Sequence, residues 1–348
     1  MHDIKSMHPE EIAAYFLSFG EPAYKAKQVF RWLSRGVRSF DEMTDISVKL
    51  REKLKQDCFL SAPGIKRKQI SQQDGTIKYL WELKDGNAIE SVFMRYEHGN
   101  TVCVSTQVGC GMGCVFCASS EGGLVRNLDA SEILDQVIFT QSDTDRTVTN
   151  VVLMGIGEPL NNLDNVIRFL ALINHKDGLN IGMRHITLST CGIAERIDKL
   201  ASYNLQLTLS ISLHAPDDAT RSLLMPVNKN SGIKKLLEAC KRYVQKTGRR
   251  ISFEYALIKG VNDSEWQAKL LYEEMAGVSG HINLIALNDV KDAEFKPGNV
   301  KRFASMLSEL GANVTIRRRL GADIDAACGQ LRKKLRSPSG KEERKVEP

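Results

Sequence analysis

The chain has 348 residues, of which 42% are hydrophobic and 26% are charged, and its formal net charge is +6. This composition is ordinary for a globular protein, no apolar run approaches a membrane span, and the first residues lack a signal peptide, so we expect a cytoplasmic protein. The positive charge permits a nucleic-acid partner without requiring one.

Residues 1–60 predict a small helical domain. Pro9, followed by two glutamates, marks the start of one helix, Pro22 starts a second, and a third covers residues 46–56. Basic side chains gather in the middle of this region: Lys25, Lys27, Arg31, Arg35 and Arg38. From charge alone, a solvated helix face is the favoured interpretation, and an RNA-binding surface is the alternative.

Residues 61–100 predict a linker, at 61–68, and a β-hairpin. Two strand patterns, Thr76–Leu83 and Ala88–Tyr96, flank the turn sequence Lys84-Asp85-Gly86-Asn87.

From residue 101 the pattern alternates between strands and helices. Strands are expected at 101–106, 149–154, 185–190, 206–213, 251–258, 281–287 and 313–316. Helices are expected at 129–140, 164–173, 232–245 and 264–276. Repeated βα units imply a parallel sheet, so the predicted fold class is α/β with a partial (β/α) barrel at 101–331 and a basic tail at 332–348. A complete barrel and a flat doubly wound sheet are the structural alternatives.

Three cysteines share the run Cys110-Gly-Met-Gly-Cys114-Val-Phe-Cys117, which follows the first strand of this alternation. Thiolates at such spacing bind soft metals or iron–sulfur clusters, and three ligands would leave one iron of a [4Fe–4S] cluster open. A zinc knuckle and buried free thiols are the alternatives. A structural zinc site usually needs a fourth ligand nearby, whereas the next cysteine after Cys117 is Cys191. The run resembles the signature of radical S-adenosylmethionine (SAM) enzymes, in which the open iron binds SAM. The other cysteines at 58, 191 and 240 are expected to be structural thiols, since no disulfide framework is indicated.

Polar clusters follow several of the predicted strands, at the rim where the active site of a (β/α) barrel gathers. As candidate SAM contacts we select Gly157, Glu158, Ser189, Ser212, Leu213, His214 and Asn288. Gly157 would permit close backbone approach, and Glu158 would pair with the SAM ammonium group.

Motifs across residues 90–331 make the resemblance closer. They are Glu90, Cys103-Val-Ser-Thr-Gln-Val-Gly-Cys110, Cys117-Ala-Ser, Arg126-Asn-Leu, Gly155-Ile-Gly-Glu-Pro, Leu188-Ser-Thr-Cys-Gly, Ser212-Leu-His-Ala-Pro, Leu224-Met-Pro-Val-Asn, Phe253-Glu-Tyr, Gly260-Val-Asn-Asp and Asp325-Ala-Ala-Cys-Gly-Gln-Leu. Together they resemble the radical SAM RNA methyltransferases that modify an aromatic carbon of adenosine. One departure is the stretch from Asn283 to Asn288, which lacks the prolines usual in that family.

The resemblance implies a role for each thiol. Cys110, Cys114 and Cys117 would hold the [4Fe–4S] cluster, Cys328 would carry a methyl group as S-methylcysteine, and Cys103 would resolve the product. Glu90 matches the family's proton acceptor. Two SAM molecules would be used per turnover: one methylates Cys328, and the other is cleaved to a 5′-deoxyadenosyl radical that activates this methyl group.

The implied reaction is methylation of C2 of an adenosine in 23S rRNA and, in addition, in some tRNAs. Implied partners are these RNAs and an electron donor such as flavodoxin or ferredoxin, and a monomer is expected. The N-terminal domain and the run Arg317-Arg318-Arg319 would contact RNA phosphates. The alternatives are the C8-methylating relative that confers antibiotic resistance and, from another class, a non-catalytic zinc-containing RNA-binding protein.

Overall fold

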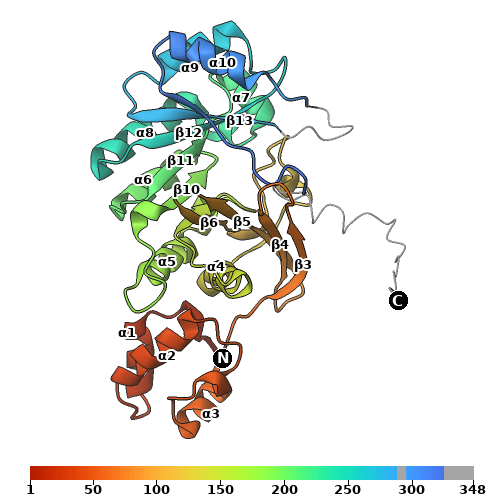
Figure 1. Cartoon of the computed structure of the whole chain (residues 1–348). Helices are drawn as coiled ribbons and strands as arrows, with labels where there is room; N and C mark the ends of the chain where they lie inside the picture. The colour runs from red at the N-terminus through yellow and green to blue at the C-terminus, as the bar shows by residue number, and fades with distance from the viewer. Residues whose placement is uncertain (288–294, 325–348) are drawn as a thin grey trace, which may run out of the picture.

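The computed structural model describes residues 1–287 and 295–324 of the chain. A small helical domain lies at one end, and a larger body of strands covered by helices makes up the rest (Figure 1). The helices are α1 (Pro9–Leu17), α2 (Tyr24–Ser34), α3 (Val48–Asp57), α4 (Ala130–Thr144), α5 (Leu163–Asn174), α6 (Ala194–Ser202), α7 (Asp218–Leu224), α8 (Asn228–Thr247), α9 (Glu265–Glu274) and α10 (Val300–Glu309). Short 3-10 helices are η1 (Ile4–Ser6), η2 (Phe40–Glu42), η3 (Ala118–Ser120), η4 (Pro159–Asn162) and η5 (Met183–His185).

The strands fall into three sheets. The main sheet has ten strands in the spatial order β14 (Val314–Ile316), β13 (Gly280–Ala286), β12 (Ile251–Leu257), β11 (Thr208–Ser212), β10 (Ile186–Thr190), β9 (Asn150–Leu153), β6 (Gly99–Cys103), β5 (Ala88–Tyr96), β4 (Ile77–Glu82) and β3 (Gly64–Ile70). Two small sheets pair β1 (His2–Asp3) with β2 (Cys58–Phe59), and β7 (Gln107–Gly109) with β8 (Leu124–Asn127).

The parallel part of the main sheet has the winding of a partial barrel. From β6 through β9 to β14, each strand pairs in parallel with the next one along the chain. A doubly wound sheet reverses its strand order at a switch point, whereas this order never reverses. The predicted partial (β/α) barrel and its seven strands are therefore confirmed.

Residues 64–70 differ from the prediction. Five of these seven residues belong to the stretch expected to be a linker, but they form β3, which pairs antiparallel with β4. β3 is an edge strand with mostly exposed side chains, including Lys66 and Lys68, so it lacks the apolar alternation that marks a half-buried strand. The predicted hairpin at β4 and β5 is confirmed, and β3 extends it to a three-stranded antiparallel addition.

Alternating side chains give the barrel strands two different faces. On the side toward the helices, the apolar residues of β10, β11 and β12 join a core with α5, α6 and α8; Leu188, Ile211 and Phe253 are among its buried members. The other side carries polar residues such as Ser189, Ser210 and Glu254, because successive residues of a strand point to opposite faces. The interior of the barrel is therefore polar near the strand ends.

The N-terminal domain is tied to the barrel by buried polar contacts. Lys5 forms an ion pair with Asp135 of α4 and donates a hydrogen bond of 2.7 Å to the carbonyl oxygen of Ser61. The Ser131 hydroxyl, also on α4, donates to Asp3 at 2.6 Å. These contacts fix the three N-terminal helices, which were all predicted, against the outer layer of the barrel. Among the described residues, no helix has the length and apolar character needed to cross a membrane.

Candidate active site

The three cysteines lie in one loop between β7 and β8. The loop is closed at its base by the antiparallel pairing of these strands, which the sequence did not predict. Gly109 has φ of +76°, and a Cβ atom there would lie 2.1 Å from the carbonyl oxygen of Gly123. Only glycine can therefore bring the two ends of the loop so close, and the Cys110 N–H bonds to that same oxygen at 3.1 Å.

The thiols of this loop are held in an apolar environment. Burial raises the pKa of Cys110 to about 11 and of Cys114 to about 12, and the negative charge that a neighbouring thiolate would carry adds to both shifts. Met112, Cys114 and Phe116 pack against a small core that contains Leu224 and Met225. In residues 1–287 and 295–324, no three His, Cys, Asp or Glu side chains are arranged to hold a single metal ion. Three soft donors in a glycine-rich, apolar loop fit an iron–sulfur cluster.

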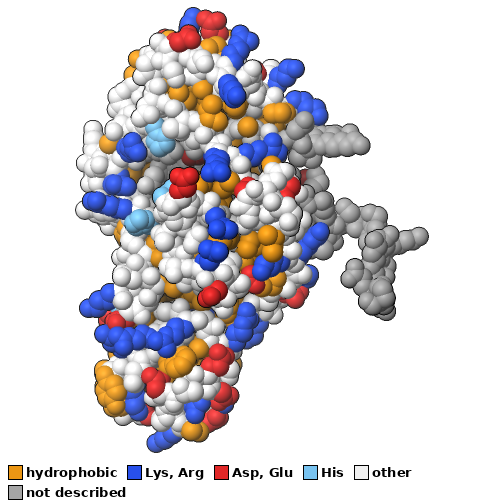
Figure 2. Space-filling view, viewed as in Figure 1, with side chains coloured by type: hydrophobic (Ala, Val, Ile, Leu, Met, Phe, Trp, Pro, Cys, Tyr) orange, Lys and Arg blue, Asp and Glu red, His pale blue; other side chains and the backbone are white. Residues whose placement is uncertain are grey.

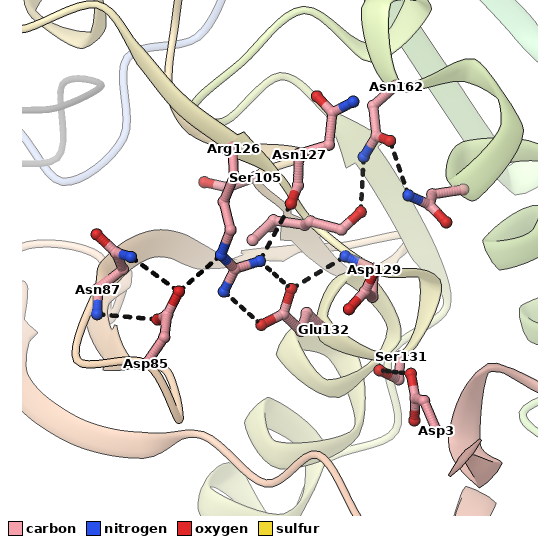
Figure 3. Close-up of polar contacts among 12 residues, drawn as sticks. Asp3, Asp85, Asn87, Ser105, Arg126, Asn127, Asp129, Ser131, Glu132 and Asn162 are labelled. Atoms are coloured by element: carbon pink, nitrogen blue, oxygen red, sulfur yellow. Dashed lines mark hydrogen bonds and ion pairs between the residues drawn. The ribbon is translucent and has the colours of Figure 1, made fainter. Parts of the chain in front are cut away.

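Arg126 fixes the loop where β8 leaves it. Its guanidinium bonds to the carboxylate of Asp85 in the β4–β5 turn at 2.7 Å, and makes two bonds, of 2.7 and 2.8 Å, to Glu132 in the first turn of α4 (Figure 3). The carboxylates of Glu132 and Asp85 raise the pKa of Arg126, so its guanidinium stays charged. In turn, Arg126 holds the pKa of Asp85 well below its usual range. The cysteine loop is therefore anchored to both the antiparallel strands and α4.

Glu158 joins three segments at the strand ends. Its backbone N–H donates to the Gln107 side chain at 2.8 Å, and its carboxylate accepts the N–H groups of Leu160 at 3.0 Å and Cys191 at 2.7 Å. Burial raises the pKa of Glu158, while these hydrogen bonds lower it. The neighbouring Gly157 has φ of +110°, and a Cβ atom there would lie 2.6 Å from the Cβ of Gln107. In this structure the Gly157 backbone therefore lies close to Gln107 of β7.

The candidate SAM contacts on β10 and β11 share the inner face of the barrel. Ser189 pairs in register with Ser210, and Ser212 with Glu254. The hydroxyls of Ser210 and Ser252 both donate to Glu254 at 2.9 Å, and the Asn283 amide donates to it at the same distance. Glu254 organises this face, although the sequence assigned it no role beyond its motif.

His214 connects the end of β11 to the cysteine loop. It has φ of +59°, its Nδ1 accepts the Ala256 N–H at 2.9 Å, and its carbonyl oxygen accepts the Asn262 side chain at 2.7 Å. Its ring meets the Phe116 ring edge-on at 4.9 Å. Burial, with a smaller effect from Arg221, lowers the pKa of His214 to about 3. The ring is therefore neutral near pH 7, with its hydrogen on Nε2.

Arg221 of α7 is a buried cation that the sequence did not single out. It donates to the carbonyl oxygens of Cys191 at 2.7 Å, Leu213 at 3.0 Å and Ser212 at 3.1 Å. These carbonyls lie at the ends of two neighbouring strands, so one guanidinium sets their spacing. The helix reads Asp-Ala-Thr-Arg-Ser-Leu-Leu, and nothing in this local sequence separates Arg221 from an ordinary surface residue.

Cys103 and Glu90 lie away from the cysteine loop, where the barrel strand β6 meets the antiparallel strands β5 and β4. Cys103 ends β6, Glu90 lies on β5, and both line a small cavity of about 20 Å³ together with Lys78 of β4. Lys78 forms an ion pair of 3.2 Å with Glu90. Burial raises the pKa of Cys103 to about 11, against the lowering effects of Arg317 and Lys78. Lys78 was not among the predicted site residues.

Two predicted site residues, Cys328 and Asn288, lie outside the described residues. The chain leading toward position 328 is described as far as residue 324. Asp323 accepts bonds from the Ser71 hydroxyl at 2.6 Å and the Gln72 N–H at 2.8 Å, and the Gly321 N–H donates to Asp74 at 2.8 Å. In Figure 1 this segment runs from β14 back to the turn between β3 and β4, at the other end of the sheet order.

The basic side chains of the N-terminal domain are largely engaged within the chain. Lys27 and Arg31 pair with Asp177 at 3.0 and 3.1 Å, and Lys25 pairs with Glu21. The guanidinium groups of Arg35 and Arg38 lie over the rings of Trp32 and Phe139. Figure 2 shows Lys and Arg side chains spread over this face, with a band where the N-terminal helices meet the barrel. Exposed ion pairs are weak, so these cations can exchange their carboxylates for phosphates.

Comparisons with known proteins agree with this arrangement. Residues 104–271 match the radical SAM superfamily, and residues 2–60 match the ribosomal RNA large subunit methyltransferase N-terminal domain. The chain is 49% identical over 335 residues to a probable dual-specificity RNA methyltransferase RlmN of Alkaliphilus oremlandii (95% of this chain, 98% of the relative). It is 50% identical over 339 residues to one of Desulforamulus reducens (96% and 97%). A crystal structure of a radical SAM methyltransferase from Sphaerobacter thermophilus is similar with a TM-score of 0.90 and 40% identity, over 95% of this chain and 99% of that one.

Proposed function

Because the chain belongs to the RlmN family of radical SAM RNA methyltransferases, we propose that it methylates C2 of adenosine in both 23S rRNA and tRNA. The family binds a [4Fe–4S] cluster and SAM, which excludes the alternative of a non-catalytic zinc-containing protein. The observation that carries the proposal is the placement of Cys103 and Glu90 in one cavity, between the barrel and the antiparallel strands that follow the N-terminal domain. A generic SAM-cleaving barrel has no need of a buried thiol and a buried carboxylate there.

We assign the cluster to Cys110, Cys114 and Cys117, whose soft donors and apolar surroundings fit it. When bound, the cluster and SAM supply the electron and the radical that activate a methyl group. The strand-end residues would orient SAM: the serines at 189 and 212 offer hydroxyls, and neutral His214 offers an Nε2–H donor next to the cysteine loop. Glu158, whose carboxylate lies at the same strand ends, would pair with the SAM ammonium group.

The remaining steps are assigned to the chain's own side chains. Cys328 carries the methyl group to the adenine ring, and Glu90 accepts the ring proton while the C–H electron pair stays with the ring. The Cys103 thiolate then attacks the sulfur of Cys328. A disulfide forms as the C–S bond breaks, and the released electron pair stays on the methylene carbon, which takes a proton to become the methyl product. The unpaired electron that entered with the radical is left over, and it would return to the bound cluster. Both cysteines are reduced to thiols before the next turnover.

The RNA would reach this site with its target base unstacked, since the ring must approach residues at the strand ends. The exposed run Arg317-Arg318-Arg319 and the band of cations beside the N-terminal helices support binding to phosphates. An electron donor of the flavodoxin or ferredoxin type and a monomeric state complete the proposal.

The product of the reaction tests it. RNA from a host that lacks its own enzyme is compared with and without this gene, by mass spectrometry of nucleosides from separated ribosomal and transfer RNA. We expect 2-methyladenosine in both fractions. Only 8-methyladenosine would assign the chain to the antibiotic-resistance relative, and product in ribosomal RNA alone would remove tRNA from the proposal.

A further inference from the structure

Strand pairing brings Lys78, Glu90 and Cys103 to one face of the sheet. Lys78 pairs in register with Val92, and Val92 pairs in register with Cys103. Lys78, Val92 and Cys103 therefore form a row across β4, β5 and β6. Residues in register share a face, and Glu90, two positions before Val92, shares it too. The positions of all three polar groups are therefore dictated by the register of the antiparallel strands.

The surroundings of Lys78 are unusual for a lysine. The residue is fully buried, with an exposed fraction of 0%, and Leu80, which follows it on the same face of β4, is buried as well. Its ion pair with Glu90 is also buried, with 4% of the carboxylate side chain exposed. Such a pair contributes little net stability, because the loss of hydration offsets the attraction between the charges.

The pair opens onto the cavity that contains Cys103. Gly155 and Ile156, which begin the loop that carries Glu158, form its other wall. In the described chain, the charged or titratable groups that act on Cys103 are Lys78 on β4, Glu90 on β5 and Arg317 after β14. Lys78 is thus a buried positive charge beside both groups to which we assign acid–base and thiol chemistry.

We propose that Lys78 is a positioning residue that keeps Glu90 as a carboxylate and directs it into the cavity shared with Cys103. A buried carboxylate without a cation would favour its neutral acid form, which cannot accept the adenine proton. With Lys78 beside it, Glu90 takes the proton and the C–H electron pair remains in the ring, so the step needs no oxidant. This inference rests on the proposed function of Glu90 and Cys103.

Three variants separate this role from a structural one. Lys78→Met removes the charge at similar length, Lys78→Arg keeps it, and Lys78→Gln keeps a hydrogen-bond donor without charge for the case in which Lys78→Met does not fold. Each is compared with the unsubstituted enzyme carrying its cluster. Two quantities are measured as functions of pH: release of the covalent RNA–protein adduct on denaturing gels, and 5′-deoxyadenosine formed per enzyme in the first turnover.

We expect Lys78→Met to form 5′-deoxyadenosine within about twofold of the unsubstituted enzyme but to release the adduct about tenfold more slowly near neutral pH, with recovery about one pH unit higher. Lys78→Gln should shift the profile in the same direction, and Lys78→Arg should keep it. In a Glu90→Gln background, Lys78→Met should add no further loss, because the effect is carried by Glu90.

Unchanged pH profiles in both uncharged variants would overturn the inference, as would an equal effect of Lys78→Met in the Glu90→Gln background. A parallel fall of 5′-deoxyadenosine in all three variants would also do so, by indicating a structural role. Failure of the underlying function looks different: the unsubstituted enzyme and Cys103→Ala would then form no RNA adduct at any pH.

Discussion

Burial decides the protonation state of His214. A histidine free in the unfolded chain titrates near pH 6.5, whereas in the folded chain burial lowers its pKa to about 3. Below pH 6.5 the unfolded chain therefore binds a proton that the folded chain refuses. The stability linked to this neutral ring is present above pH 6.5 and is lost as the pH falls toward 3.

Replacing His214 by Asn tests this linkage. Asn tolerates a positive φ, and its side-chain oxygen can accept the Ala256 N–H, but it does not titrate. We expect the free energy of unfolding of the unsubstituted protein to fall, relative to that of His214→Asn, by up to about 1.4 kcal/mol per pH unit below pH 6.5. Urea unfolding of both proteins at several pH values measures it. Parallel pH dependences would show that the ring is already charged in the folded state.

The two thiols assigned to the reaction should differ in their trapped products. Cys103→Ala should add the methylene group to RNA without releasing it, so the protein stays bonded to RNA through Cys328. Cys328→Ala has no carrier and should form no such bond. Denaturing gels of each variant purified from cells, with and without nuclease, compare them, and Cys240→Ala, a buried thiol far along α8, is the matched control. An RNA-bonded band in Cys328→Ala would reverse the roles.

Sequence patterns predicted those elements whose residues repeat with a clear period. The seven parallel strands, the hairpin and helices such as α4, with Asp129 and Glu132 at its start, carry their own signals. β3 was missed because an exposed, charged edge strand has no apolar face. β7 and β8 were missed because each is short and gains its partner only when the cysteine loop closes.

The site divides in the same way. Cysteine spacing and strand-end motifs are local, so the sequence could offer them as candidates, and their mutual distances in the folded chain follow from the barrel order. Lys78, Arg221 and Glu254 act through contacts with distant segments, such as the bond from Arg221 to the Cys191 carbonyl 30 residues away. No local pattern distinguishes such buried polar residues from ordinary surface ones.

The anchor between Asp323 and the β3–β4 turn leads to a prediction about the methyl carrier. Cys328 follows Asp323 by five residues, a span of at most about 18 Å when fully extended, so this anchor limits where the carrier can go. We expect Asp323→Ala to lower methyl transfer about tenfold, because the segment loses two hydrogen bonds of roughly 1 kcal/mol each. Initial rates of 2-methyladenosine formation measure the loss.

Ser71→Ala removes one of these bonds and should lower the rate less than Asp323→Ala does. Because both substitutions remove the same bond, the double variant should be no slower than Asp323→Ala alone. Asp164→Ala is the control, because this highly exposed carboxylate pairs only weakly, at 3.2 Å, with Lys199 on the barrel's outer layer. Rates equal to the control for both variants would argue against the anchor.

At the scale of the molecule, the pair of Lys5 and Asp135 joins the helical domain to the barrel. Lys5→Met would leave a buried carboxylate without its cation, and we expect this to destabilise the protein by about 3–5 kcal/mol. Burial already raises the pKa of Asp135 to about 6, and loss of Lys5, which lowers it, would raise it further. The folded variant therefore binds a proton more readily than the unfolded chain, so its stability should be regained as the pH falls and lost as it rises.

Thermal unfolding of Lys5→Met at several pH values checks this expectation. The double variant Lys5→Met/Asp135→Leu should recover most of the loss, since two apolar side chains can replace a buried ion pair. Lys269→Met, at an exposed pair with Glu265, is the matched control and should change little. A penalty for Lys5→Met that is independent of pH would mean that packing, not charge, joins the domains.

The anchor of the C-terminal segment also affects the order in which the protein matures. Ser71 and Asp323 are 252 residues apart in the sequence, and Gly321 and Asp74 are separated by 247. Contacts of such separation close late, because the chain between them must first be made and folded. A nascent chain can therefore complete the antiparallel strands and the cysteine loop well before residue 323 reaches the turn at Ser71. If Cys328 is the carrier, a partly synthesised chain that has not reached this residue could not bond to RNA.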